Sequence, residues 1–230
     1  LRRLYIDLIG RGPTEKELLA AAAAGREAAV DGLLKSEEFW RNWYEEELYY
    51  FLLIDQFRPT SEPLASLPAR LARGEADPRA ALMEIVISQY FNARNPGNDT
   101  FVTVVLEQVL GMKVQEKENV ATLEAGKKLY DGAQAKFLGE QGASQSDVVR
   151  IAFAKKGFSE RYVERLHRRL AGAEPGAAAR TAAAERFEKD PRSLATIVRE
   201  WVLSPEYVTR LTTPRAKTDP QWIRTLYADL

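Results

Sequence analysis

Hydrophobic side chains recur along this chain at the three- and four-residue spacing of amphipathic helices. Strict apolar–polar alternation, the mark of half-buried strands, is scarce. The pattern therefore predicts an all-α protein. The helical spacing is clearest in two stripes, formed by Leu1, Leu4, Tyr5, Leu8 and Ile9, and by Val102, Val105, Leu106, Val109 and Leu110.

Helix ends are marked by glycine and by capping residues. Gly10, Gly111 and Gly172 each follow an apolar turn, where a glycine can adopt the left-handed conformation that ends a helix. Thr14 and Glu17 form a capping-box pattern. Aspartate before proline predicts three further helix starts, at Asp77-Pro78, Asp190-Pro191 and Asp219-Pro220.

Two marks recur and predict a repeat. The first is an apolar turn that ends in glycine, found at residues 4 to 10, 105 to 111 and 166 to 172 and begun again at 226 to 230. The second is Ser-x-x-aromatic, in which serine would cap a helix and the aromatic side chain would pack inward. Its four occurrences are Ser36 to Phe39, Ser88 to Phe91, Ser159 to Tyr162 and Ser204 to Tyr207.

These marks divide the chain into units of uneven length. We predict an irregular, compact array of helix pairs rather than a regular solenoid, because solenoid repeats have a nearly constant period. The predicted parts are N-terminal repeats over 1–95 (units near 1–43 and 44–95), C-terminal repeats over 96–211 (units near 96–161 and 162–211), and a linker with the start of a further unit over 212–230.

Proline, glycine and asparagine clusters predict linkers between the helices. The expected linkers are residues 58–68, 92–100, 139–146 and 212–220, with an insertion over 126–145. The alanine-rich runs 20–24 and 177–184 predict helix, because alanine has the highest helix propensity.

Composition excludes several kinds of function. Lys plus Arg and Asp plus Glu are both 33, so no net basic field attracts nucleic acid. Without cysteine the chain has no disulfide, no thiolate metal site and no thioether-attached haem. The longest apolar stretch, residues 48–54, is far shorter than the ~20 residues of a membrane helix. Because both ends lie inside apolar-periodic patterns, we expect a piece of a longer protein.

Two segments carry a family resemblance. Residues 1–14 (LRRLYIDLIGRGPT), followed by LLKSEEF at 33–39 and by Trp43, resemble the opening of the planctomycete-type cytochrome-associated domain of unknown function. Residues 95–98 and 109–115 resemble a later segment of that family, which usually runs into a Cys-x-x-Cys-His haem motif. Here residues 116–119 read EKEN, so the resemblance implies no attached haem.

A second resemblance is at the level of motifs. The units, with Ser-Pro-Glu-Tyr at 204–207, are similar to the helical repeats of phycobilisome-linker-like domains in secreted bacterial proteins. Both resemblances imply an extracytoplasmic bacterial setting, in the periplasm or at the cell surface, and a scaffold-like role. Neither supplies catalytic residues.

The sequence predicts no catalytic, cofactor-binding or metal-binding residues. His167 is the single histidine, and its arginine neighbours favour a solvated basic helix face over a catalytic base. The carboxylates of residues 45–47 point about 100° apart on a helix, which favours a solvated face. The strip Arg161, Arg165, Arg168 and Arg169 lacks interleaved aromatic residues for base stacking.

The crowded aromatic residues between 39 and 57 are the strongest pointer to a partner. One helix cannot turn all of these side chains in the same direction, and exposed aromatics often anchor interfaces. We therefore predict a structural or protein-interaction module of a larger extracytoplasmic protein. Alternatives are a haem-less accessory subunit of a c-type cytochrome complex, or an enzyme with acidic residues and His167. The predicted partner surface comprises Trp40, Trp43, Tyr44, Tyr49 and Tyr50.

Overall fold

The structure is a computed structural model that describes residues 1–172 and 175–212. Within these residues the chain is built of helices and one short hairpin, which confirms the all-α prediction. None of the described helices is long and apolar enough to cross a membrane.

The first half of the described chain runs through seven α-helices and one 3₁₀ turn. In order they are α1 (Arg2–Ile9), α2 (Glu15–Ala24), α3 (Arg26–Leu34), α4 (Glu37–Leu52), the 3₁₀ turn η1 (Leu64–Ser66), α5 (Leu67–Ala72), α6 (Pro78–Ile87) and α7 (Gln89–Arg94).

The second half has the same order of helices with a hairpin inserted. Strands β1 and β2 pair antiparallel, with Lys136 opposite Gln141. The elements are α8 (Gly97–Val104), the π-helical turn η2 (Val105–Val109), α9 (Lys117–Tyr130), β1 (Ala135–Phe137), β2 (Glu140–Gly142), α10 (Gln145–Phe153), α11 (Lys156–Ala171), α12 (Ala177–Lys189), the 3₁₀ turn η3 (Pro191–Ser193), α13 (Leu194–Leu203) and α14 (Pro205–Thr212).

Most predicted helix ends are confirmed. Gly10, Gly111 and Gly172 adopt φ values of 74°, 69° and 68°, which only glycine enters without a steric penalty. At Gly10 space is also short, because a Cβ would lie 2.5 Å from Asn42 Oδ1. The Thr14–Glu17 capping box is present. Asp77 caps α6, and Asp190 caps η3. Asp219-Pro220 lies outside the described residues.

Three of the four serine marks also act as predicted. The hydroxyls of Ser36, Ser88 and Ser204 accept from the backbone N–H of the aromatic residue three positions on. The prediction for Ser159 is wrong, because this residue is buried inside α11. The helix starts earlier, at the N-cap Lys155, so the aromatic residue at the equivalent position is Phe158.

The repeat in the structure is longer than a helix pair. The predicted unit boundaries near 43/44 and 161/162 fall inside the two longest described helices, α4 and α11. These two helices correspond to each other at a spacing of 119 residues, so that Phe39 matches Phe158 and Trp43 matches Tyr162. In the first half α4 packs against α1, α5, α6 and α7, and in the second α11 packs against η2, α12, α13 and α14. The recurring unit is therefore a half of the described chain.

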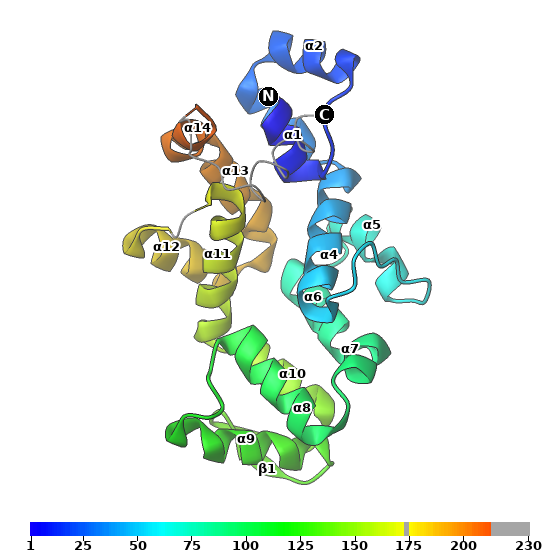
Figure 1. Cartoon of the computed structure of the whole chain (residues 1–230), viewed down its shortest axis with the longest axis vertical. Helices are drawn as coiled ribbons and strands as arrows, with labels where there is room; N and C mark the ends of the chain where they lie inside the picture. The colour runs from blue at the N-terminus through cyan, green and yellow to red at the C-terminus, as the bar shows by residue number, and fades with distance from the viewer. Residues whose placement is uncertain (173–174, 213–230) are drawn as a thin grey trace, which may run out of the picture.

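The two halves interlock across an approximate two-fold relation. Helix α3 packs against α13, and its counterpart α10 packs against α6. Phe91 of α7 packs on Phe101 of α8, and at the matching place the Tyr207 hydroxyl of α14 donates to Asp7 of α1. Figure 1 shows α1 and α2 at one end of the molecule, and α8 and α9 at the other. One hydrophobic core joins both halves, while the domain division at 95/96 stays a prediction.

The centre of the molecule is the contact between α4 and α11. The Trp43 indole N–H donates to the Tyr162 hydroxyl over 2.7 Å in a fully buried contact. Next to it Glu47, only 1% exposed, is ion-paired with Arg165, and Glu46 lies 3.5 Å from Arg169. The prediction of a solvated face is therefore wrong for Glu47, because α11 covers that side of α4.

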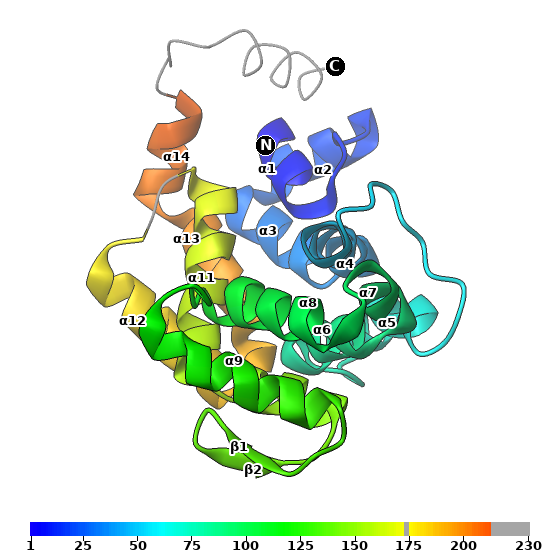
Figure 2. The same ribbon diagram turned by 60° about the horizontal axis from the view of Figure 1, so that its bottom comes forward.

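Two predicted linkers are shorter or more ordered than expected. Between 92 and 100 only Asn95 and Pro96 separate α7 from α8, because the polar residues after Pro96 form the first turn of a helix. Between 139 and 146 the chain forms β2 and enters α10. Figure 2 shows the hairpin lying under α9, where Gly126 leaves room for Phe137. The predicted linker at 212–220 lies almost wholly outside the described residues.

Candidate functional site

The predicted aromatic surface divides into a buried and an exposed part. Trp40, Trp43 and Tyr44 are 8%, 0% and 3% exposed, so the prediction that these three form an accessible surface is wrong. They are buried because α4 is enclosed by helices of both halves. Tyr50 is half-buried, donates from its hydroxyl to the Gln108 carbonyl and carries Arg165 over its ring. Tyr49 is the exposed member, at 52%.

Tyr49 belongs to a small apolar surface where α4 ends. Leu53 and Ile54 follow it in sequence and are 53% and 43% exposed. We call Tyr49, Leu53 and Ile54 the α4-end surface. Leu53 ends α4 with φ 52°, in the left-handed region that leucine avoids, and its backbone N–H donates to Tyr49 over 2.8 Å. At the matching position after α11 stands Gly172.

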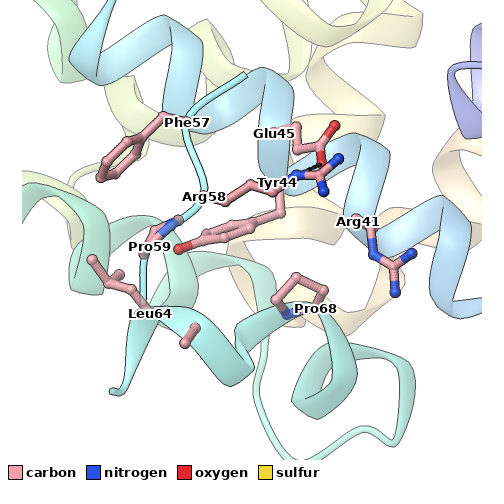
Figure 3. A pocket seen from close by; sticks show the side chains of 9 residues that line it. Arg41, Tyr44, Glu45, Phe57, Arg58, Pro59, Leu64 and Pro68 are labelled. Atoms are coloured by element: carbon pink, nitrogen blue, oxygen red, sulfur yellow. Dashed lines mark ion pairs between the residues drawn. The ribbon is translucent and has the colours of Figure 1, made fainter. Parts of the chain in front are cut away.

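The loop that starts with this surface runs from residue 53 to 63 and covers a cavity of about 280 Å³ beside α4. Figure 3 shows its lining, with Phe57, Pro59, Leu64 and Pro68 around the ring of Tyr44. Glu45 and Arg58 approach at its edge, 3.9 Å apart. The Tyr44 hydroxyl is buried without a hydrogen-bond partner among the described residues, and burial, with Glu84 nearby, raises its pKa. The phenol is therefore neutral.

A second cavity, of about 410 Å³, lies between the end of the same loop and the junction of α6 with α7. We call it the Glu62–Glu84 cavity, after the two carboxylates in its wall. The rest of the wall is largely apolar and includes Pro63, Leu64, Ile87 and Tyr90. Ser61 and Tyr90 share a hydrogen bond of 3.1 Å that ties the loop to α7.

Glu84 is the chemically unusual group of this cavity. Its Oε2 atom is buried and makes no hydrogen bond to a described residue, although Arg70 Nη1 lies 3.5 Å away. Burial raises the pKa of Glu84, and the nearby Arg70 offsets this only in part. The carboxylate is thus incompletely compensated by the protein itself.

A third cavity, of about 400 Å³, joins the two halves and is basic. Its wall contains the Trp40 ring together with Lys35, Arg73 and Arg192. All three cations are exposed, and Arg73 is already paired with Glu75 at 2.7 Å. This hollow is a surface groove with solvated charges.

The other candidate groups do not converge on a reaction site. His167 packs edge-on against Trp201, with ring centroids 4.9 Å apart. In the basic strip, Arg165, Arg168 and Arg169 form ion pairs with Glu47, Glu164 and Glu46. Among the residues that the structure describes, no group of three His, Asp or Glu side chains could hold a metal ion.

Comparisons with models of protein families, with curated proteins and with solved structures give no match to this chain. The resemblances noted in the sequence therefore stay predictions.

Sequence reasoning missed the two most informative residues of this region. Leu53 could have been noticed, because it stands where the repeat places glycine. Glu84 could not have been noticed in the sequence, because it differs from other glutamates only through its burial under the loop that folds over it.

Proposed function

We propose that this chain is a structural or protein-interaction module of a larger bacterial protein, and that it docks onto its partner through the α4-end surface. The observation that carries the proposal is the conformation of Leu53. A left-handed residue with a Cβ costs roughly 1–2 kcal/mol, and glycine would avoid most of this cost. An exposed leucine held there at the expense of stability is best explained by a contact outside the free chain.

The neighbouring side chains support this reading. Tyr49 and Ile54 extend the apolar area on either side of Leu53, and all three are about half exposed. Interfaces are commonly centred on a few apolar or aromatic anchors of this kind, surrounded by polar residues. Here Asp55 and Gln56 follow directly and are exposed.

The enzyme alternative has less support from the geometry. His167, the base it would need, packs on Trp201. The neighbouring carboxylates at residues 45–47 lie next to Arg58, Arg169 and Arg165. Both arrangements are those of structural contacts.

An extracytoplasmic location is part of the proposal and rests on the two family resemblances alone. Its test is the accessibility of an epitope-tagged full-length protein to protease in cells whose outer membrane has been permeabilised. Digestion before lysis supports the location. Digestion only after lysis contradicts it.

The docking proposal is tested by photo-crosslinking in the cells that make the full-length protein. A photoreactive amino acid at position 53 should give one abundant protein adduct. The same residue at position 118, an exposed site on α9, is the control and should give none. A c-type cytochrome as the adduct would identify the chain as a haem-less accessory subunit. Equal labelling at both positions would contradict the α4-end surface as the docking site.

A further inference from the structure

We infer that the docking partner inserts a lysine or arginine side chain, flanked by apolar residues, into the Glu62–Glu84 cavity. This inference rests on the proposed docking function and names the chemistry of the partner. It follows from the apolar walls of the cavity, from the sign of its charges and from the loop that the cavity shares with the α4-end surface.

The walls would hold the aliphatic stem of a long basic side chain. Pro63, the buried Leu64 and Ile87 line the cavity, and Ile87 is 42% exposed although it is a large apolar residue. Lysine and arginine pack their methylene stems along such apolar surface while the charged head finds a polar partner. A partner residue of this type would cover Ile87.

The charges of the cavity are negative. Glu62 and Glu84 both line it, whereas Arg70, the cation nearest to Glu84, does not. Glu62 already accepts a hydrogen bond from the Ser66 hydroxyl. Its negative charge repels that of Glu84 and further raises the pKa of Glu84. An incoming anion would meet two carboxylates. An incoming ammonium or guanidinium group would instead be attracted by both carboxylates, and Glu84, whose side chain is 28% exposed, would accept a charge-assisted hydrogen bond from it.

The cavity and the α4-end surface belong to one stretch of chain. The loop begins at Leu53 and Ile54 and ends at the cavity with Ser61 to Leu64. In its middle the Phe57 ring packs against Tyr90, 4.9 Å between centroids, and Tyr90 is itself a wall of the cavity. The loop that begins at Leu53 is therefore anchored at the wall of the cavity through Phe57 and Ser61, which both contact Tyr90.

The test uses the whole chain with hexylammonium as a probe for a lysine side chain. Binding is followed through the methyl NMR signal of Ile87, with hexanol and hexanoate as matched probes of the same length. We expect saturable shifts with hexylammonium. Hexanol should bind about tenfold more weakly, because it is uncharged and loses the charge-assisted hydrogen bond. Hexanoate should not bind, because its negative charge is repelled by the two carboxylates. Equal affinity for the three probes would overturn the inference.

Variants locate the effect at the carboxylates. Glu84→Gln should weaken hexylammonium binding about tenfold, and Glu62→Gln should weaken it less, because Glu62 is more exposed. Glu118→Gln on α9 is the control and should leave binding unchanged. Should Glu84→Gln fail to fold, Glu62→Gln still carries the test. Undiminished binding in every folded variant would contradict the assignment.

This experiment and the crosslinking experiment fail separately. Loss of the position-53 adduct removes the docking surface, whatever the probe does. A retained adduct in the Glu84→Gln chain at wild-type yield, together with equal binding of all probes, would keep docking and remove the basic side chain.

Discussion

The buried hydrogen bond between Trp43 and Tyr162 lies where the two halves meet, and its acceptor can be removed without changing shape. Tyr162→Phe leaves the indole N–H of Trp43 buried without its partner. We expect the free energy of unfolding to fall by about 1–3 kcal/mol in urea titrations. Tyr49→Phe removes an exposed hydroxyl and should change it by less than about 0.5 kcal/mol. If both variants lose the same free energy of unfolding, the buried hydrogen bond contributes no more to stability than an exposed hydroxyl.

The carboxylate of Glu17 makes stability depend on pH. Hydrogen bonds from Arg11, and then from the Thr14 backbone N–H, lower its pKa from 4.5 to about 2. A carboxylate whose pKa is lowered by folding contributes its full stabilisation above the pKa it has in the unfolded chain. This stabilisation is lost as the pH falls toward the pKa of the folded state. The window is therefore about pH 4.5 to 2. The side chain is 34% exposed, so solvent screening limits the effect to about 1 kcal/mol.

Unfolding measured at pH 6, 4 and 2.5 checks this assignment. In Glu17→Gln the acid-dependent loss should be smaller than in the wild-type chain by about that amount. Glu15→Gln changes a carboxylate in the same first turn of α2 and serves as the control. If both variants flatten the pH profile equally, the contacts with Arg11 and Thr14 are not the cause.

At the scale of elements, α4 and α11 end in matching turns with different residues. Leu53→Gly should leave the free energy of unfolding unchanged or raise it by up to about 1 kcal/mol, because glycine relieves the left-handed strain but loses chain entropy. Gly172→Leu should lower it by about 1–2 kcal/mol. Thermal unfolding of the two variants measures both.

The Leu53→Gly variant also separates stability from docking. A chain that is at least as stable as wild type, yet loses its partner, would place the leucine at the interface. A chain destabilised by more than about 1 kcal/mol would mean that Leu53 has a structural role in the free protein.

Element boundaries show how far local patterns reach. The glycine stops and most caps could be predicted because a cap depends on neighbouring residues alone. Ser159 misled the prediction, because it lies four positions after the true N-cap, Lys155, yet forms the same Ser-x-x-aromatic pattern with Tyr162. The hairpin over 135–142 escaped notice because strands of three residues leave no periodic pattern.

At the scale of the whole molecule, the shared core predicts that the halves need each other. Helix α3 rests on α13, and α10 rests on α6, so each half leaves apolar surface exposed when alone. We expect residues 1–95 and 96–230, produced as separate chains, to have little fixed tertiary structure and to form a folded 1:1 complex when mixed. Size exclusion and near-ultraviolet circular dichroism test this. Two independently folded chains would contradict it.

The same scale decides the candidate site. Its residues come from α4, the loop after it, α6 and α7, and they meet because the loop folds back over α4 and is tied to Tyr90. No spacing in the sequence links Glu62 with Glu84.

The sequence by itself determined the helical class, the places where most helices begin and end, and the existence of a repeat, because helix periodicity, capping and left-handed glycines depend on residues a few positions apart. Only the tertiary structure decided which aromatic side chains are buried, that Glu47 faces Arg165, and that the repeat is a half of the described chain. These features depend on which faces of α4 are covered by helices distant in sequence. The sequence of α4 itself does not indicate which helices pack against it.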